Sequence, residues 1–231
     1  MTQPQQAMTA ASYRSMGSPA KHTYHDTLID RLLIGLISRQ IARTLGSQTP
    51  FKGYVGFVDL SRQIMQGRNA LEQQAVVAVV LRSLVPSPVL TAIRTLFTPT
   101  RRVCELNAWF ATRLFEWLVG PCDLQTVEVK GTTGQSQLQT SGVHIQKCRY
   151  LEQSGCVGMC LNLCKLPTQK FFTQDFGIPL TLTPNFEDFS CEMVFGQEPP
   201  DFTTEAAYQQ GCLSTCTLSA THRPTCPTVR D

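Results

Sequence analysis

The sequence has neither a strong excess of charge nor a long apolar run. Charged residues make up 16% of its 231 residues, and the formal net charge is +3. Lys and Arg are scattered, mostly singly, so the composition gives no reason to expect nucleic acid as a partner. The longest apolar candidate, residues 75–81, stops at Arg82. It falls well short of the roughly 18 residues that a membrane-spanning helix needs.

Several catalytic motifs are also missing. The chain has no Gly-rich phosphate loop, no GxSxG elbow and no HExxH motif. Hydrolase and nucleotide-dependent functions therefore lack support. The first residues show no uninterrupted apolar stretch with a small-residue cleavage site, so no secretory signal is predicted. We accordingly expect the cysteines to work in a reducing compartment, where clustered thiols favour metal or redox chemistry over disulfides.

The first half of the chain has the apolar spacing of helices. Residues 1–22 are rich in polar and small residues without an acidic one, and we predict that they are disordered. Residues 23–120 form the predicted helical region. Its first helix carries an apolar stripe that includes Leu28, Leu32 and Leu36, and Gly46 is a natural end. A capping box begins another helix further on. A hydrophobic content of 42% permits a sizeable core.

Much of the second half has the alternating apolar pattern of strands rather than the spacing of helices. Residues 125–130 and 142–150 alternate like strands and are joined by a polar linker near residues 132–139. Residues 178–183 and 190–195 predict a second strand pair. The expected fold class is therefore α+β, with an N-terminal helical part packed on a small mixed Cys-rich domain of short antiparallel strands. We place that domain at residues 121–220 and an irregular tail at residues 221–231.

Cysteine is what the sequence has in abundance, with ten in the chain. Six of them fall within residues 156–216: Cys156, Cys160, Cys164, Cys191, Cys212 and Cys216. We expect a helix at the first three, which must end near Pro167. A straight helix would separate Cys156 from Cys164 by about 12 Å, so one small ion cannot bind all three. The simplest metal site uses two of these three cysteines, together with Cys191 and one or both of Cys212 and Cys216. Such thiols are good ligands for a soft transition metal or an iron–sulfur cluster.

Other interpretations of the cysteines remain open. Free cysteine packs like a small hydrophobic residue, and this is the favoured role for Cys104, Cys122 and Cys148. Cys226 is interpreted as incidental. Structural zinc is the next competitor, although its ligands are usually closer in sequence. A helical-hairpin disulfide framework would need an oxidising compartment. His144, on a predicted strand, is a further candidate ligand, and a surface role is the more common one for a lone histidine.

Two long stretches resemble a known family. Residues 152–172 run EQSGCVGMCLNLCKLPTQKFF, and residues 176–197 run FGIPLTLTPNFEDFSCEMVFGQ. Both resemble the iron-dependent β-carotene isomerase family, whose plant members open strigolactone biosynthesis. Pro199-Pro200 and residues 212–216 also resemble its C-terminal pattern. The close resemblance covers roughly residues 148–216, and the preceding helical part is compatible with it.

The resemblance implies interconversion of all-trans and 9-cis β-carotene by an iron-dependent enzyme. It carries the metal role to the matching cysteines, which are Cys156, Cys160, Cys164, Cys191, Cys212 and Cys216. It also implies a carotenoid substrate and peripheral contact with carotenoid-bearing, thylakoid-type membranes. The location would be cytoplasmic in a bacterial phototroph and chloroplastic in a plant or alga. Protein partners are not predicted.

The chemistry of a polyene suggests how iron would serve such an enzyme. Rotation about a double bond requires a lower π-bond order, and transient one-electron exchange with a thiolate-bound iron centre would provide it. A Lewis-acid role is less attractive because a hydrocarbon has no oxygen to polarise. The alternatives are a non-catalytic iron–sulfur electron carrier and a zinc-stapled interaction module.

Overall fold

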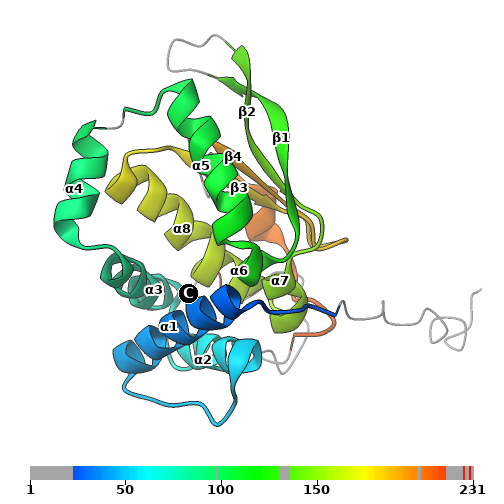
Figure 1. Ribbon diagram of the computed structural model, residues 1–231. Helices are drawn as coiled ribbons and strands as arrows, with labels where there is room; N and C mark the ends of the chain where they lie inside the picture. Colours follow the sequence, from blue (N-terminus) through cyan, green and yellow to red (C-terminus); the bar gives the residue numbers. More distant parts are fainter. Residues whose placement is uncertain are drawn as a thin grey trace, which may run out of the picture.

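A computed structural model describes residues 23–96, 98–130, 136–201 and 204–216, together with Cys226 and Val229. The expected α+β class is confirmed, because helices are followed by an antiparallel sheet (Figure 1). The predictions for residues 1–22 and for most of the tail at 221–231 lie outside the described residues. The N-terminal helices are α1 (Leu28–Leu45), α2 (Gly53–Met65), α3 (Ala70–Leu84), α4 (Ser87–Leu96), α5 (Arg101–Leu114) and α6 (Glu116–Val119).

The C-terminal region alternates strands with short helices. Its elements are β1 (Cys122–Lys130), β2 (Ser136–Ile145), α7 (Arg149–Ser154), the π-helix η2 (Met159–Lys165), α8 (Leu166–Lys170), the π-helix η3 (Phe171–Phe176), β3 (Leu180–Pro184), β4 (Cys191–Phe195) and the 3-10 helix η4 (Ala206–Gln209). The predicted boundary near residue 120 falls between the end of α6 and the start of β1.

Local sequence signals begin and end the N-terminal helices as the sequence predicted. At the start of α3, Asn69 Oδ1 accepts from the Glu72 N–H at 3.0 Å, and the Glu72 carboxylate accepts from the Asn69 N–H at 2.9 Å. This is the expected capping box. Helix α1 ends at Gly46, which adopts a φ of 65° that a side chain would disfavour. The last part of the predicted helical region forms two helices, α5 and α6, which meet at Phe115.

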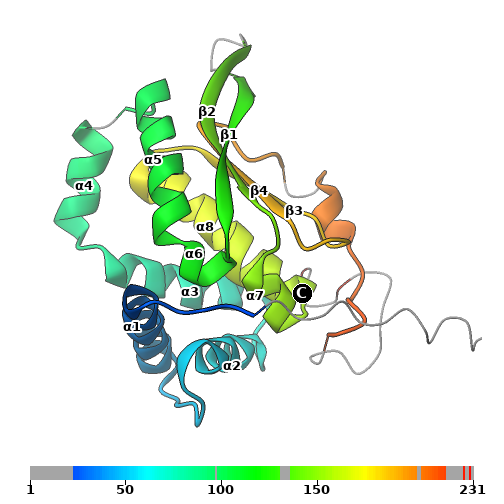
Figure 2. The same cartoon turned by 45° about the vertical axis from the view of Figure 1, so that its right-hand side comes forward.

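The sheet has the order β1-β2-β4-β3 with every neighbouring pair antiparallel. Helix α5 lies across β1, β2 and β4, and η4 lies beside β3 and β4 away from α4 (Figure 2). The second strand was predicted too late in the chain. It begins at Ser136, within the expected linker, and ends at Ile145. Helix α7 follows, and Cys148 is its N-cap. The Cys148 sulfur accepts a hydrogen bond from the Leu151 N–H at 3.5 Å.

The cysteine-bearing helix does not end at Pro167, contrary to expectation. It continues from η2 through α8 into η3, so one helical rod runs through the proline. In a π-helix each N–H bonds to the fifth preceding residue rather than the fourth. Pro167 lies in the first turn of α8, directly after η2, where a missing backbone N–H is tolerated.

One continuous core joins the helices to the sheet. The Phe57 ring of α2 meets the rings of Trp117 and Tyr150, with centroids 5.6 and 5.7 Å apart. The buried Arg149 guanidinium pairs with Asp26 and lies 3.7 Å from the centre of the Tyr54 ring. Arg149 therefore has a structural role, in which α7 is fixed to α2 and to the chain before α1.

Candidate functional site

A large apolar cavity of about 540 Å³ lies between the N-terminal helices and the rod of η2, α8 and η3. Among the described residues, no charged side chain lines it. Aliphatic and aromatic side chains form most of the wall, including Leu33, Ile37, Val80, Phe110, Trp117 and Phe172. Its size and lining suit a ligand of a few hundred Å³ that has little or no polar surface.

Few polar groups reach this cavity, and they are engaged with the protein. Asn107 Nδ2 donates to the Val103 carbonyl at 2.8 Å, and the Tyr150 hydroxyl is hydrogen-bonded to Ser61. Burial raises the pKa of Tyr150 well above its ordinary value, so the phenol stays protonated at neutral pH. The cavity thus offers a hydrocarbon surface with only neutral polar groups.

A much smaller chamber of about 50 Å³ lies next to the cavity. Four cysteines line it: Cys148, Cys160, Cys164 and Cys191. They come from three places in the chain, namely the start of α7, the π-helix η2 and the first residue of β4. Both cysteines of η2 face this chamber, as residues four apart on one helix face can do.

The cavity and the chamber share a wall. Five residues line both: Phe115, Leu118, Tyr150, Cys164 and Thr168. Cys164 alone among them carries a thiol, and it is half-buried while Cys160 is buried. The structure therefore presents one sulfur to an apolar ligand and keeps three others behind it.

Burial keeps these thiols neutral in the protein without a bound cation. It raises the pKa of Cys148 to about 11 and that of Cys164 to about 12, and it raises the pKa of Cys160 and Cys191 well above the ordinary value. Neighbouring thiols strengthen the effect on Cys160, Cys164 and Cys191, and the charge of Lys165 opposes it. A cation in the chamber would favour the thiolates, as metal binding to cysteine does.

Lys165 is a fully buried cation at the edge of the same chamber. Its Nζ donates to Glu205 Oε1 at 2.9 Å, to Gln169 Oε1 at 3.0 Å and to the Leu182 carbonyl. Gln169 Oε1 also accepts from the Leu182 N–H at 2.8 Å. This network fixes the π-helix, β3 and the segment before η4 around the thiols.

A second group of thiols lies apart from the chamber. Cys156 precedes the helical rod, because Gly155 adopts a φ of 60° and interrupts the chain between α7 and η2. Burial raises the pKa of Cys156 to about 12, and contact with Cys216 and the nearby Cys226 adds to the increase. The even spacing of Cys156, Cys160 and Cys164 in sequence therefore does not place all three on one face.

The structure divides the six predicted ligands. It brings Cys160, Cys164 and Cys191 together, places Cys156 with Cys216, and leaves Cys212 half-buried against the core. Cys148, which the sequence assigned to packing, joins the first group. The distance of Cys148 in sequence from the other cysteines did not indicate a metal ligand. Its position directly before α7 could have indicated a helix cap.

The cysteine groups do not close around a single ion. Within the described part of the chain, no three His, Cys, Asp or Glu side chains are placed so that they could hold one metal ion. His144 pairs through Nδ1 with Glu192 of the neighbouring strand and is one-third exposed. Asp188 accepts from the Ser190 N–H within its own turn. Neither of these groups lines the thiol chamber.

The fold and the two cavities define a protein with a large apolar cavity beside buried cysteines. Residues 117–204 match the family described as "Beta-carotene isomerase D27-like, C-terminal". The chloroplastic β-carotene isomerase D27 of Medicago truncatula is 37% identical over 205 residues, which cover 89% of this chain and 79% of that protein. Its counterpart in Arabidopsis thaliana is 34% identical over 193 residues, which cover 83% of this chain and 71% of that protein. No solved structure matches the chain significantly.

The chain therefore belongs to the β-carotene isomerase D27 family and is an enzyme of the isomerase class.

Proposed function

We propose that the chain isomerises a carotenoid double bond, of the type that interconverts all-trans and 9-cis β-carotene. The observation that carries this proposal is the wall shared by the apolar cavity and the thiol chamber. A carotenoid is a long hydrocarbon, so it requires an enclosed surface free of charge. The cavity has such a surface and presents the Cys164 sulfur to its contents.

We further propose that the enzyme depends on iron. Thiolates are donors that bind iron well, and four sulfurs from distant parts of the chain line one small space, although they would have to move closer together to bind one ion. Cys160, Cys164 and Cys191 would hold the metal, with Cys148 in the position of a fourth ligand. Cys156, Cys212 and Cys216 remain candidates from the family pattern. When bound, iron would supply the one-electron exchange that lowers the bond order of the polyene.

The side chains of the cavity have separate tasks in this proposal. Phe57, Trp117 and Phe172 line the cavity and exclude water from the polyene, so that transient charge on it is not quenched by solvent. Tyr150 lies in the shared wall with its phenol protonated, so it presents a dipole and no anion to the substrate. The substrate is oriented by shape rather than by hydrogen bonds.

The proposed setting is the surface of a carotenoid-bearing membrane. The two relatives are named chloroplastic, which supports a chloroplast location for this chain if it comes from a plant or alga. In a bacterial phototroph the corresponding place is the cytoplasmic side of thylakoid-type membranes. We infer peripheral contact because the substrate dissolves in the bilayer, and we infer no nucleic-acid partner from the low net charge.

A direct assay tests the proposed reaction. The purified full chain should convert all-trans β-carotene in detergent micelles into a 9-cis isomer, which chromatography separates from the starting material. An iron–sulfur electron carrier would contain iron and leave the carotenoid unchanged, and a zinc-stapled module would contain zinc alone. Family membership favours the isomerase over these two alternatives.

Filling the cavity should inhibit the reaction. Ala111 lies on α5, is 3% exposed and lines the cavity. The change Ala111→Phe would place a ring where the polyene must lie. We expect turnover to fall roughly tenfold or more, because misplacing a substrate by about 1 Å can cost a hundredfold. Initial rates in micelles measure the effect.

The matched control is Ala75→Phe on the exposed side of α3, which should leave turnover unchanged. Thermal unfolding of both variants shows whether they remain folded. Unchanged kinetics in a folded Ala111→Phe protein would argue against this cavity as the substrate site.

A further inference from the structure

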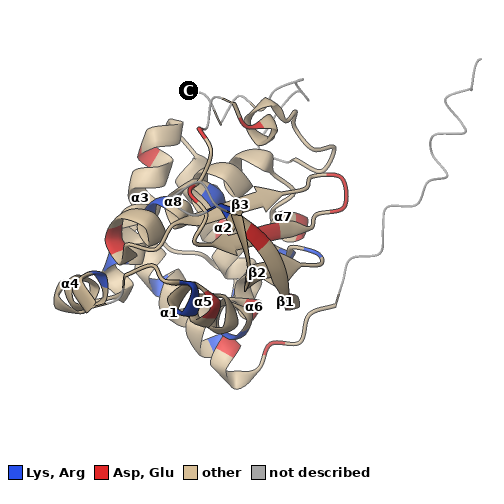
Figure 3. Cartoon of the chain, turned by 90° about the horizontal axis from the view of Figure 1, so that it is seen from above, with Lys and Arg blue, Asp and Glu red and all other residues tan. Residues whose placement is uncertain are grey.

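The mouth of the apolar cavity is surrounded by hydrophobic side chains that face solvent. Leu36 of α1 is 51% exposed, and Phe110 and Leu114 of α5 are 52% and 47% exposed. All three also line the cavity. The lining thus continues onto the outer surface of two helices, which lie on the same side of the molecule (Figures 1 and 3).

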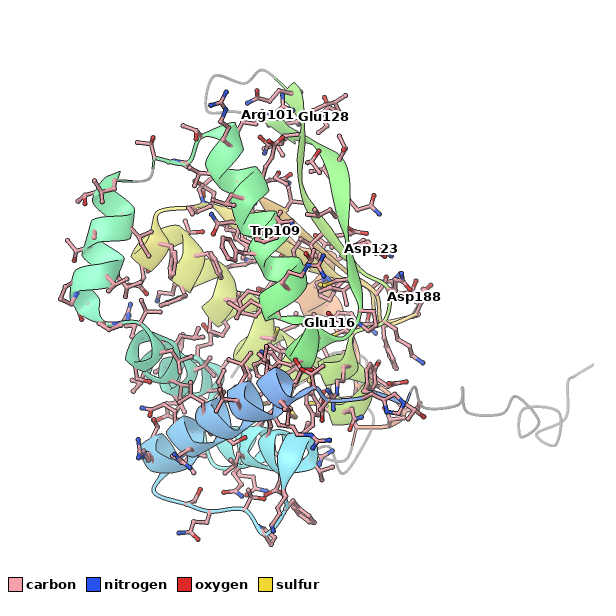
Figure 4. The ribbon with its side chains drawn as sticks, viewed as in Figure 1. Arg101, Trp109, Glu116, Asp123, Glu128 and Asp188 are labelled. Atoms are coloured by element: carbon pink, nitrogen blue, oxygen red, sulfur yellow. The ribbon has the colours of Figure 1, made fainter. Side chains whose placement is uncertain are left out.

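Further exposed apolar residues extend this surface along both helices. On α1, Leu28 and Leu32 are 82% and 71% exposed and lie on the same helical face as Leu36. On α5, Leu106 and Trp109 are 50% and 46% exposed, and Figure 4 labels Trp109 on this helix. We call the following residues the collar: Leu28, Leu32, Leu36, Leu106, Trp109, Phe110 and Leu114. Such a contiguous apolar surface marks an interaction site.

Arginines continue the same helical faces beyond the collar. Arg39 and Arg43 follow Leu36 on α1 at helical spacing, and Arg102 and Arg113 stand one turn before Leu106 and one turn after Trp109 on α5. All four are exposed. An apolar face flanked by arginines is typical of helices that lie in a membrane interface with their cations toward the headgroups.

Two acidic groups on the collar helices are engaged by partners within the protein. Asp30 accepts from the Thr27 N–H at 2.8 Å within the cap of α1. Glu105 pairs with Arg101 at 2.8 Å and also accepts from the Thr140 N–H at 3.1 Å, on the side of the sheet. Glu116 of α6, two residues after Leu114, is exposed, so the four exposed arginines outnumber the exposed acidic group that follows the collar in the chain.

Charge is distributed unevenly over the described part of the molecule, with basic residues in excess on the helical side and acidic residues in excess on the sheet side. Residues 28–119 contain eleven basic residues (Lys and Arg) and five acidic residues (Asp and Glu). Residues 120–216 contain five basic and ten acidic residues. Basic segments appear on α1, α4 and α5 in Figure 3. The acidic residues Asp123, Glu128 and Asp188 lie along the opposite, sheet side in Figure 4. An anionic surface would attract the helical side and repel the sheet side.

The geometry points to one occupant for the collar, which we infer to be the surface of a lipid bilayer that contains anionic lipids. The collar would enter the acyl boundary, and the arginines would contact lipid phosphates or sulfates. The cavity would then open directly into hydrocarbon, so a carotenoid could pass between bilayer and enzyme without crossing water. This inference rests on the proposed carotenoid substrate.

The attachment is peripheral in this arrangement. No single helix of the described residues is long and apolar enough to cross a membrane. Helices α3 and α4 reach the required length and apolarity only as a pair, and they meet at an angle of 84°. Electrostatic attraction and shallow insertion therefore carry the binding, which should weaken as salt is added.

Vesicle flotation tests the inference with the full chain. We expect it to float with phosphatidylcholine vesicles that contain phosphatidylglycerol, and much less with phosphatidylcholine alone. The double variant Leu32→Ser with Trp109→Ser should bind roughly a hundredfold more weakly, because withdrawing each such side chain from an apolar phase costs about a factor of ten. The control Leu138→Ser changes a leucine that is 65% exposed on β2 and should bind normally.

Charge and fluorescence provide independent measurements. Arg102→Gln with Arg113→Gln should weaken binding to anionic vesicles, whereas Lys130→Gln, on the exposed end of β1, should not. The chain has two tryptophans, and Trp117 is buried. Vesicles should therefore shift the emission of Trp109 to shorter wavelength, and Trp109→Phe should remove the shift.

Failure of this inference can be separated from failure of the proposed function, since the isomerase assay in micelles needs no bilayer. A chain that is active in micelles but does not bind vesicles would overturn the docking surface alone. Equal loss of binding in the collar and Leu138 variants would also overturn it. So would a concentration-dependent dimer that the Leu32 and Trp109 changes disrupt, because a second copy would then be the occupant.

Discussion

Replacing Cys160 by Ser is expected to abolish both the iron content and the isomerase activity of the chain. Cys160 is buried and lines the thiol chamber with Cys148, Cys164 and Cys191. A serine hydroxyl is a poor ligand for a metal that thiolates bind, and loss of even an outer-shell partner can cost a metal site roughly 10–100-fold. We therefore expect turnover to fall by roughly a hundredfold or more.

The matched control is Cys104→Ser on α5. Cys104 is also fully buried but lines neither cavity, so this change removes a packed thiol without touching the chamber. It should lower stability slightly and leave iron content per folded molecule unchanged. Elemental analysis of the purified proteins and initial rates in micelles provide the two measurements. An iron-free Cys160→Ser protein with full activity would refute the proposed mechanism.

Replacing Lys165 by Met is expected to cause the largest loss of stability. The change leaves the Glu205 carboxylate, the Gln169 amide oxygen and the Leu182 carbonyl without their shared donor. Breaking a buried ion pair by removing one partner typically costs about 3–5 kcal/mol, because the other charge stays buried. Urea unfolding followed by circular dichroism measures the free energy of unfolding.

Two further variants separate the ion pair from general effects of the substitution. Lys170→Met alters an exposed lysine at the end of α8 and should change stability little. Adding Glu205→Gln to Lys165→Met removes the unpaired carboxylate and should restore part of the loss. If Lys165→Met unfolds within about 1 kcal/mol of the unchanged chain, the buried network does not carry the expected weight.

The sequence predicted the elements whose signals are local. The apolar stripe of α1, the capping box at Asn69 and the strands near residues 180 and 191 all follow from short-range patterns. The π-helix η2 before Pro167 did not, because it packs against α2 and α3, which are distant in the chain and give no local signal. Helix α7 was missed since Cys148 is an unusual cap.

The cavity could not be predicted from the sequence. Leu33, Ile37 and Val80 have the spacing of residues that pack against a neighbouring helix, and that spacing is the same when they line a cavity. The arrangement of the thiols was equally hidden. The three evenly spaced cysteines predict one helix face, but the left-handed Gly155 places Cys156 before the helix begins. Backbone conformation at one residue thus decided which sulfurs meet.

The shared wall has a consequence for regiochemistry if the cavity holds a polyene as proposed. Cys164 occupies one fixed point along the cavity, so only the part of a polyene that rests against this point lies next to the thiols. Substitutions that change the space available on one side of Cys164 should therefore move the reacting bond along the polyene without altering the thiols.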